Sequence, residues 1–230
     1  MGSGRRCAAV LMALAALSVT GCGKKQPTDA DRGDRASSKV MQVEGVRVWL
    51  DPDGTKPYDD SAVAVVRNTG DKIASGVTIK LTWPNKYNTK QDEAIVVPPG
   101  KQGVFLLGPF DAPPDTKGEP KAEVFVDSLK DGGQDVPVKL GGFKQSGCSL
   151  SGTTSNTFKA AHPGVNGLVA GLKDGKVVTG GSIFFEEPGL TPGEDGTFKA
   201  TLEPLCPEGK VDEWVAFPNL SVADLNDNQG

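Results

Sequence analysis

The sequence is poor in the side chains that most often carry out catalysis or hold metal ions. Its 230 residues contain a single histidine, His162, and only four cysteines. A G-x-S-x-G motif, which places a nucleophilic serine on a strand-to-helix turn in many hydrolases, does not occur. We therefore expect no catalytic, cofactor-binding or metal-ligating residues, and we predict a protein that is not an enzyme.

Aromatic residues are also scarce, at 6% of the chain, whereas glycine and proline are abundant, with 30 and 17 copies. Glycine and proline interrupt helices and favour turns between short strands. The composition therefore excludes a long helical bundle and predicts a mainly β fold.

The first residues have the composition of an export signal. Arg5 and Arg6 precede a 13-residue apolar run, Cys7–Val19. This run is shorter than the about 20 apolar residues that a membrane-spanning helix needs, and it suits a signal peptide. Residues 19–22 read Val-Thr-Gly-Cys, which resembles the bacterial lipobox. We expect residues 1–21 to be a lipoprotein signal peptide and Cys22 to carry the lipid after cleavage.

Charge then limits the possible partners. Without residues 1–21 the chain keeps 23 basic and 29 acidic residues, a net charge of −6, which disfavours nucleic acids and anionic lipid surfaces. Attachment to a bacterial membrane would depend on the acyl chains at Cys22, at about 0.8 kcal/mol per buried CH₂. Residues 22–39 are charged and almost free of apolar side chains, so we expect a disordered tether there.

Two cysteines remain for the folded part. Cys7 belongs to the predicted signal peptide and Cys22 to the lipid anchor, which leaves Cys148 and Cys206. Two cysteines in an exported chain most simply form one disulfide. A metal or redox role lacks support, because the pair has no C-x-x-C spacing.

From residue 40 onward, apolar and polar side chains alternate in short runs bounded by turn residues. The clearest run is Val77–Trp83, with four apolar side chains on one face. Asp174-Gly175 is a two-residue hairpin signal. Strands are predicted at Met41–Leu50, Ser61–Val66, Val77–Trp83, Ala94–Val97, Gly103–Leu107, Ala122–Leu129, Ser149–Asn156, Leu168–Leu172, Val177–Phe185, Phe198–Leu202 and Trp214–Val222.

The two halves of this β region are similar in sequence, which predicts two tandem units, residues 40–136 and 137–230. Both contain Asn-Thr, Gly-Val and a later Pro-Gly-x-x-Gly-x-Phe stretch. The matching positions are Asn68-Thr69 and Asn156-Thr157, Gly76-Val77 and Gly164-Val165, and the segments Pro99–Phe105 and Pro192–Phe198. Each unit has about the length of a small β-sandwich of about 100 residues.

The order of these motifs resembles the FxLYD domain, an immunoglobulin-like β-sandwich of bacterial exported lipoproteins. The second unit carries the resemblance best, with Leu172 followed by Asp174-Gly175-Lys176, and with Thr191-Pro192-Gly193 leading to Phe198. Ala170 and Lys173 stand where the family has its Phe and Tyr. The resemblance implies two tandem immunoglobulin-like sandwiches, and it implies no general activity.

Minor candidates for binding are found in the loops. Residues 51–60 contain four carboxylates, and a weak calcium site near Asp51 and Asp53 stays open, although the D-x-D-x-D-G loop is absent and Asp-Pro and Asp-Gly are ordinary turn sequences. His162 lies in a turn-like stretch and is read as a surface side chain. Trp83 and Trp214 alternate with polar residues and suit a core, whereas Tyr87 lies in a polar loop and is the aromatic expected to be exposed.

These observations favour a lipid-anchored exported lipoprotein, on the cell surface or the periplasmic side of a bacterial membrane. Its function would be that of a non-catalytic binding or adaptor module that engages another envelope protein through exposed strand edges. The alternative is a sensor of small ligands or glycans that uses a cleft between the two units. An envelope enzyme would need acidic side chains to converge in one concave site.

Overall fold

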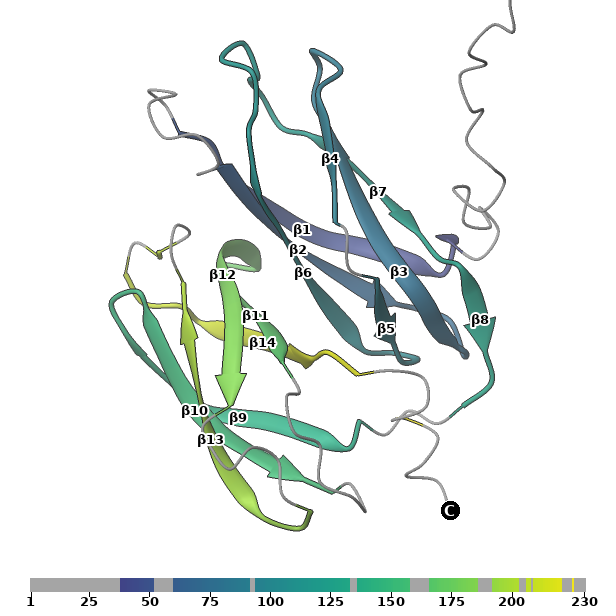
Figure 1. Ribbon diagram of the computed structural model, residues 1–230, viewed down its shortest axis with the longest axis vertical. Coiled ribbons are helices and arrows are strands. Elements are labelled where there is room, and N and C mark those ends of the chain that lie inside the picture. Colours follow the sequence, from purple (N-terminus) through teal and green to yellow (C-terminus); the bar gives the residue numbers. More distant parts are fainter. Residues whose placement is uncertain are drawn as a thin grey trace, which may run out of the picture.

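The computed structural model describes residues 38–51, 60–91, 94–132, 136–157, 166–185, 192–202, 206–207, 209–220 and 225. These residues are mainly β (Figure 1). The first half contains β1 (Met41–Trp49), β2 (Asp60–Asn68), β3 (Ile73–Thr82), β4 (Asn88–Lys90), β5 (Ile95–Val97), β6 (Gln102–Phe110), β7 (Lys121–Phe125) and β8 (Ser128–Lys130). The second half contains β9 (Val138–Ser146), β10 (Ser149–Asn156), β11 (Gly167–Lys173), β12 (Lys176–Phe185), β13 (Asp195–Thr201) and β14 (Glu213–Pro218).

The first half is a sandwich of two antiparallel layers. One sheet has the order β1-β2-β6, and in the other β3 pairs with β4, β5, β7 and β8. The alternation predicted for Val77–Trp83 is confirmed, because Val77, Ile79, Leu81 and Trp83 are all at most 2% exposed. They pack with Phe105 from the facing sheet, so each sheet covers the apolar face of the other.

The second half forms one six-stranded antiparallel sheet, in the order β14-β11-β12-β13-β10-β9. An immunoglobulin-like unit would divide its strands between two sheets. Here β12 pairs with β11 as far as Ile183 and with β13 from Ser182, so it joins strands that would otherwise belong to separate sheets. The sheet curves around its own core, which includes Leu150, Phe198 and Leu202.

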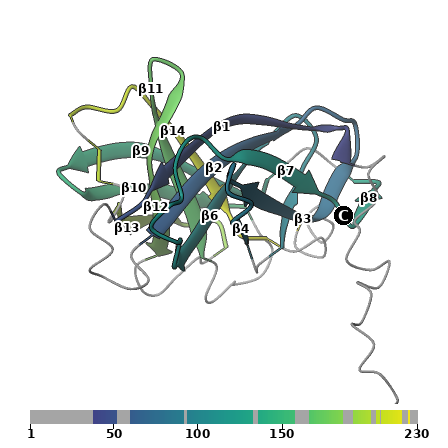
Figure 2. The same ribbon diagram turned by 90° about the horizontal axis from the view of Figure 1, so that it is seen from above.

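The two halves share a hydrophobic core. Their sheets lie against each other, as the ribbon views show (Figures 1 and 2). The outer face of the β1-β2-β6 sheet packs against β11, β12 and β14. Val215 and Phe217 of β14 belong to the same buried cluster as the sandwich interior. Two glycines allow this close approach, because a Cβ on Gly45 would lie 2.8 Å from Val177 Cγ2 and one on Gly180 would lie 2.5 Å from Val63 Cγ2.

Strand β2 is therefore covered on both faces. Its residues Ser61–Val66 are all buried. Ala64 lies opposite Phe105 of β6, whose ring is in the sandwich core, whereas its neighbour Val63 contacts the second half at Gly180. The short apolar run that predicts this strand thus reflects two packing surfaces rather than one.

A smaller cluster joins the C-terminal segment to both halves. Leu220 and Leu225 are buried with Ile73 and Val96 of the first half and Val138 of the second. The sheets divide between β8 and β9, close to the predicted boundary at residues 136 and 137, but the buried clusters extend across that boundary.

The internal sequence repeat corresponds to a repeated structural corner. The strands β1-β2-β6 and β9-β10-β13 pair in the same order, and β2 and β10 both end at an Asn that is followed by Thr. Thr69 donates from its backbone N and its Oγ1 to the carbonyl of Val40, and Thr157 donates in the same way to Pro137.

The Pro-Gly turns complete the two corners. Gly100 N donates to Asn68 O, and Gly193 N donates to Asn156 O, each at 2.9 Å. Both glycines have positive φ, +70° and +72°, which glycine adopts without strain. In the sequence repeat, Gly76-Val77 of the first half corresponds to Gly164-Val165 of the second, and this second pair lies outside the described residues.

Most predicted strands are present, but β4 and β9 were not predicted, and one predicted strand is divided in two. The Asp174-Gly175 turn joins β11 to β12 with positive φ at both residues, as a type I′ hairpin requires. Strand β9 was not predicted, because Gly141 and Gly142 interrupt its apolar pattern. The predicted strand Ala122–Leu129 is two strands, β7 and β8, which pair with successive parts of β3.

Candidate functional site

The sites expected from the sequence lie partly outside the described residues. Cys22, His162 and Asp53 are among the residues whose structure is not described. Asp51 is described, and its backbone N donates to Asp60 Oδ1 at 2.7 Å. The other carboxylate oxygen of Asp60 accepts from Ala112 N at 2.7 Å, so this buried carboxylate holds two chain segments together.

Metal-binding side chains do not gather in the described part of the chain. Within it, no group of three or more His, Cys, Asp or Glu side chains is arranged to hold an ion. A helix long and apolar enough to cross a membrane is likewise not found among the described residues.

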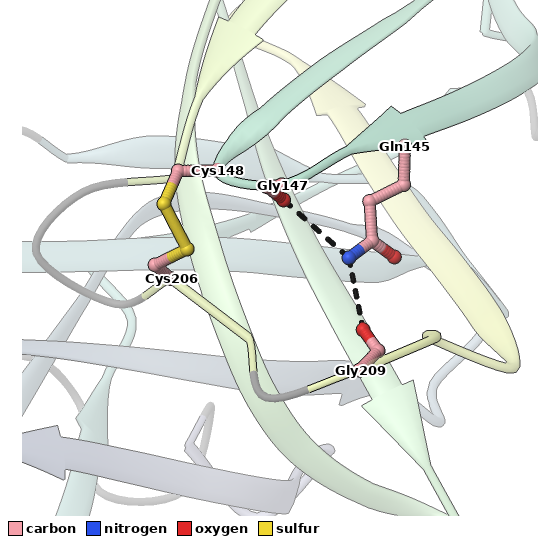
Figure 3. Close-up of a disulfide and its surroundings, with 5 residues drawn as sticks. All are labelled: Gln145, Gly147, Cys148, Cys206 and Gly209. Carbon is pink, nitrogen blue, oxygen red and sulfur yellow. Dashed lines mark hydrogen bonds between the residues drawn. A yellow bond between two sulfur atoms is a disulfide. The ribbon is translucent and has the colours of Figure 1, made fainter.

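The expected disulfide is present between Cys148 and Cys206, with an S–S distance of 2.03 Å and a Cα–Cα distance of 4.8 Å (Figure 3). Cys148 lies in the turn between β9 and β10, and Cys206 begins the segment that leads to β14. Strands β9 and β14 are the opposite edges of the six-stranded sheet. The bridge therefore ties the segment before one edge strand to the turn after the other.

The side-chain amide of Gln145 on β9 forms hydrogen bonds that connect the same two edge regions (Figure 3). Its Nε2 donates to Gly209 O at 2.9 Å and to Gly147 O at 3.5 Å. Its Oε1 accepts from Val211 N at 3.2 Å. One side chain of β9 thus holds the backbone of residues 209–211 in place.

A cleft of about 590 Å³ opens beside this segment, and we call it the pinned cleft. The rings of Phe143 and Trp214 are half-buried in it, with centroids 6.2 Å apart and planes at 31°. Phe143 also packs in a T-shaped arrangement with Phe198 of the core, with ring centroids 5.8 Å apart. Lys210 and Asp212 are exposed at the rim.

A second cleft, of about 680 Å³, lies between the two sheets of the sandwich and is called the edge groove. Strand β1 lines one side of it, and residues 118–122 line the other. The lining is aliphatic apart from Arg47 and Glu119. Its apolar side chains are Val43, Val46, Val48, Leu50, Pro120 and Ala122.

Strand β1 borders the edge groove, and one of its two backbone edges is unpaired among the described strands. It pairs with β2, and among the described strands it has no second neighbour. Strand β7, across the groove, pairs with β3 in the same one-sided way. The groove therefore combines apolar lining with strand edges that can form further hydrogen bonds.

A third cleft, of about 320 Å³, lies between the two halves. Leu106, Leu107 and Pro109 line it from the first half and Leu168 and Ser182 from the second. Gln91 also lines it, is 7% exposed, and its buried Oε1 has no hydrogen-bond partner.

The expectation for Tyr87 is wrong. Its ring is half-buried and packs at 5.5 Å from Trp83 and 6.3 Å from Phe110, measured between centroids. Burial, followed by the negative charges of Asp60 and Asp111, raises the pKa of the Tyr87 hydroxyl above its ordinary value of 10. The polar neighbours of Tyr87 in sequence gave no sign that its ring turns inward.

Several residues of these clefts had no signal in the sequence. Gln145 and Phe143 lie on the unpredicted strand β9, and Gln91 follows a short edge strand that was not predicted either. The apolar alternation of β1 was visible, but alternation does not tell whether another sheet covers the face.

The chain was compared with protein-family models, with curated proteins and with solved structures, and no match was found in any of the three comparisons.

Proposed function

We propose that the protein is an exported bacterial lipoprotein, anchored to a membrane through lipid on Cys22, whose folded part binds another envelope protein. The basic start, the 13-residue apolar run and the Val-Thr-Gly-Cys sequence support the anchor. The two-layer sandwich of the first half supports the proposed likeness to immunoglobulin-like FxLYD domains. The proposed role is that of a non-catalytic adaptor.

The edge groove is the observation that carries the binding role. Strand β1 offers a free edge, and the apolar side chains Val46 and Val48 of β1 and Leu50 just after it line the adjacent groove at alternate positions, beside Arg47. An extended segment added to a sheet edge gains backbone hydrogen bonds, and its alternate side chains enter such a groove. The proposed occupant is therefore an extended segment of another protein, with apolar residues at alternate positions.

The shared core supports this role in a second way. Because the outer face of the β1-β2-β6 sheet packs on the second half, β1 belongs to a braced layer and not to a thin, isolated sheet. A braced edge changes little in conformation on binding, which reduces the entropy lost by the receptor.

Photocrosslinking in cells tests the proposal. A photoreactive amino acid at Arg47, which is exposed at the edge groove, should crosslink to one extended segment of a partner, and Val48→Glu should abolish the crosslink. The same photoreactive group at Lys139, exposed on β9, is the matched control. Crosslinks only to a second copy of the chain, or crosslinks that survive Val48→Glu, would refute the adaptor.

The lipid anchor has an independent test. Cys22→Ser should abolish labelling by an alkyne-bearing fatty acid and should release the protein from the membrane fraction. Labelling that persists in this variant would contradict the assignment of Cys22.

The cleft between the halves favours the second candidate function, a small-ligand sensor. A buried amide oxygen without a donor, such as Gln91 Oε1, suits a ligand that brings an N–H or O–H group. Chemical-shift mapping with a library of small polar compounds should then perturb resonances around Gln91 and Ser182. The absence of any such perturbation at millimolar concentrations would remove this candidate.

A further inference from the structure

We propose that the pinned cleft binds a saccharide. The cleft lies in the second half, between the edge strands β9 and β14, and the proposed adaptor role does not use it. Its lining combines two aromatic rings with exposed polar groups, whereas the edge groove has aliphatic side chains and no aromatic ring.

The aromatic side chains form the part of the site that a sugar ring would contact. Phe143 and Trp214 are neither fully buried nor fully exposed, and their planes differ by only 31°. The face of an aromatic ring carries partial negative charge and attracts the partly positive C–H groups of a pyranose face. Both rings pack against the core of the second half and keep part of their surface exposed in the cleft, and this exposed part is what a sugar unit would contact.

The rim supplies hydrogen-bonding groups of both kinds. The Lys210 side chain is exposed and donates, and the Asp212 carboxylate is exposed and accepts. Asp212 Oδ2 accepts from Asp174 N at 3.1 Å, which orients the carboxylate while its second oxygen stays available for a hydroxyl. Hydroxyl groups around a sugar ring act as both donors and acceptors, so this mixture suits a saccharide better than an alkyl chain.

The wall of the cleft is held in place before any ligand arrives. The bridge to Cys148 fixes Cys206, and the Gln145 amide holds the backbone at Gly209 (Figure 3) and at Val211. A wall fixed in this way avoids the entropy cost of ordering a loop on binding. Both restraints thus act on the wall of the cleft.

Isothermal titration with two probes tests the proposal: a tetramer of N-acetylglucosamine and a tetramer of mannose, each added to the folded chain. We expect saturable binding of at least one of the two tetramers. In NMR spectra, the same tetramer should shift the indole resonances of Trp214. Trp214→Ala should weaken binding by at least about tenfold. Lys210→Ala and Asp212→Ala both lie at exposed positions, and each should weaken binding several-fold. Asp212→Ala also removes the hydrogen bond from Asp174 N, so Lys210→Ala is the variant that leaves the contacts of the fold unchanged.

Controls separate this site from other surfaces. Phe184 is 58% exposed on β12, away from the cleft lining, so Phe184→Ala should leave saccharide binding unchanged. Val48→Glu in the edge groove should also leave it unchanged, which distinguishes failure of this inference from failure of the adaptor proposal. The inference is overturned if neither tetramer binds at millimolar concentration, or if the Trp214, Asp212 and Lys210 variants bind as well as the native chain.

Discussion

Replacing Asn68 by alanine should remove three hydrogen bonds from a fully buried corner of the first half. The side chain of Asn68 is 0% exposed. Its Nδ2 donates to Lys72 O and Val97 O, each at 2.8 Å, and its Oδ1 accepts from Gly70 N at 2.9 Å. The amide therefore joins the end of β2 to the segment before β3 and to the end of β5.

The expected magnitude follows from the number of bonds. An intramolecular hydrogen bond contributes about 1 kcal/mol net, and a buried group that loses its partner costs about 1–3 kcal/mol. Asn68→Ala should thus lower the free energy of unfolding by about 3 kcal/mol, a large part of the 5–15 kcal/mol typical of a whole domain. The variant should still fold, because both sheets and the shared core stay intact.

Urea unfolding followed by circular dichroism measures this loss, with the disulfide kept oxidised. Asn88 is exposed on β4, so Asn88→Ala should change stability by less than about 0.5 kcal/mol and serves as the matched control. An Asn68→Ala variant within about 0.5 kcal/mol of the native chain would refute the reasoning.

Asn68→Asp adds a pH-dependent test. The introduced carboxylate can still accept from Gly70 N, but it faces the carbonyl oxygens of Lys72 and Val97. Burial beside these oxygens raises the pKa of the introduced carboxyl above its ordinary value of about 3.9. The variant should therefore regain stability relative to the native chain as the pH falls from 7 towards 4, and a pH-independent difference would contradict this geometry.

Three further predictions concern the disulfide, the contact between the halves and Tyr87. Serine at both Cys148 and Cys206 should lower the free energy of unfolding by about 4 kcal/mol, because the bridge spans 58 residues of the unfolded chain, and guanidinium unfolding with and without reductant checks this. Gly180→Ala should cost about 1–3 kcal/mol by crowding Val63, and a double-mutant cycle should show that Val63→Ala recovers part of the loss, whereas strict additivity would argue against the contact. The hydroxyl of Tyr87 should titrate above pH 10 in an NMR titration, and because its folded pKa is raised, its contribution to stability should be complete below pH 10 and decline above it; a midpoint at or below 10 would contradict its burial.

Local pattern was enough to predict several elements. The alternation of Val77–Trp83 identifies the buried face of β3, since a strand with one covered face must alternate. Asp-Gly between two apolar runs predicts the β11–β12 turn, because both residues must adopt positive φ. The pairing of Cys148 with Cys206 followed from counting the cysteines that remain after the predicted signal peptide and lipid anchor.

Contacts between distant segments could not be predicted in the same way. Alternation shows which face of a strand is apolar, but not that Val63 meets Gly180 more than a hundred residues later. The single sheet of the second half depends on β12 pairing with both β11 and β13, which no short pattern encodes. The pinned cleft depends on Gln145, a polar side chain whose role arises only when the sheet brings its two edges together.

The double covering of β2 limits how the protein can diverge over generations. In an ordinary surface strand, every second position faces solvent and tolerates change, so lineages accumulate neutral substitutions there. Residues Ser61–Val66 have no such face, because one set of side chains fills the sandwich and the other meets the second half. A change in size at Val63 needs a matching change across the interface, so the two halves are bound to evolve together through this strand.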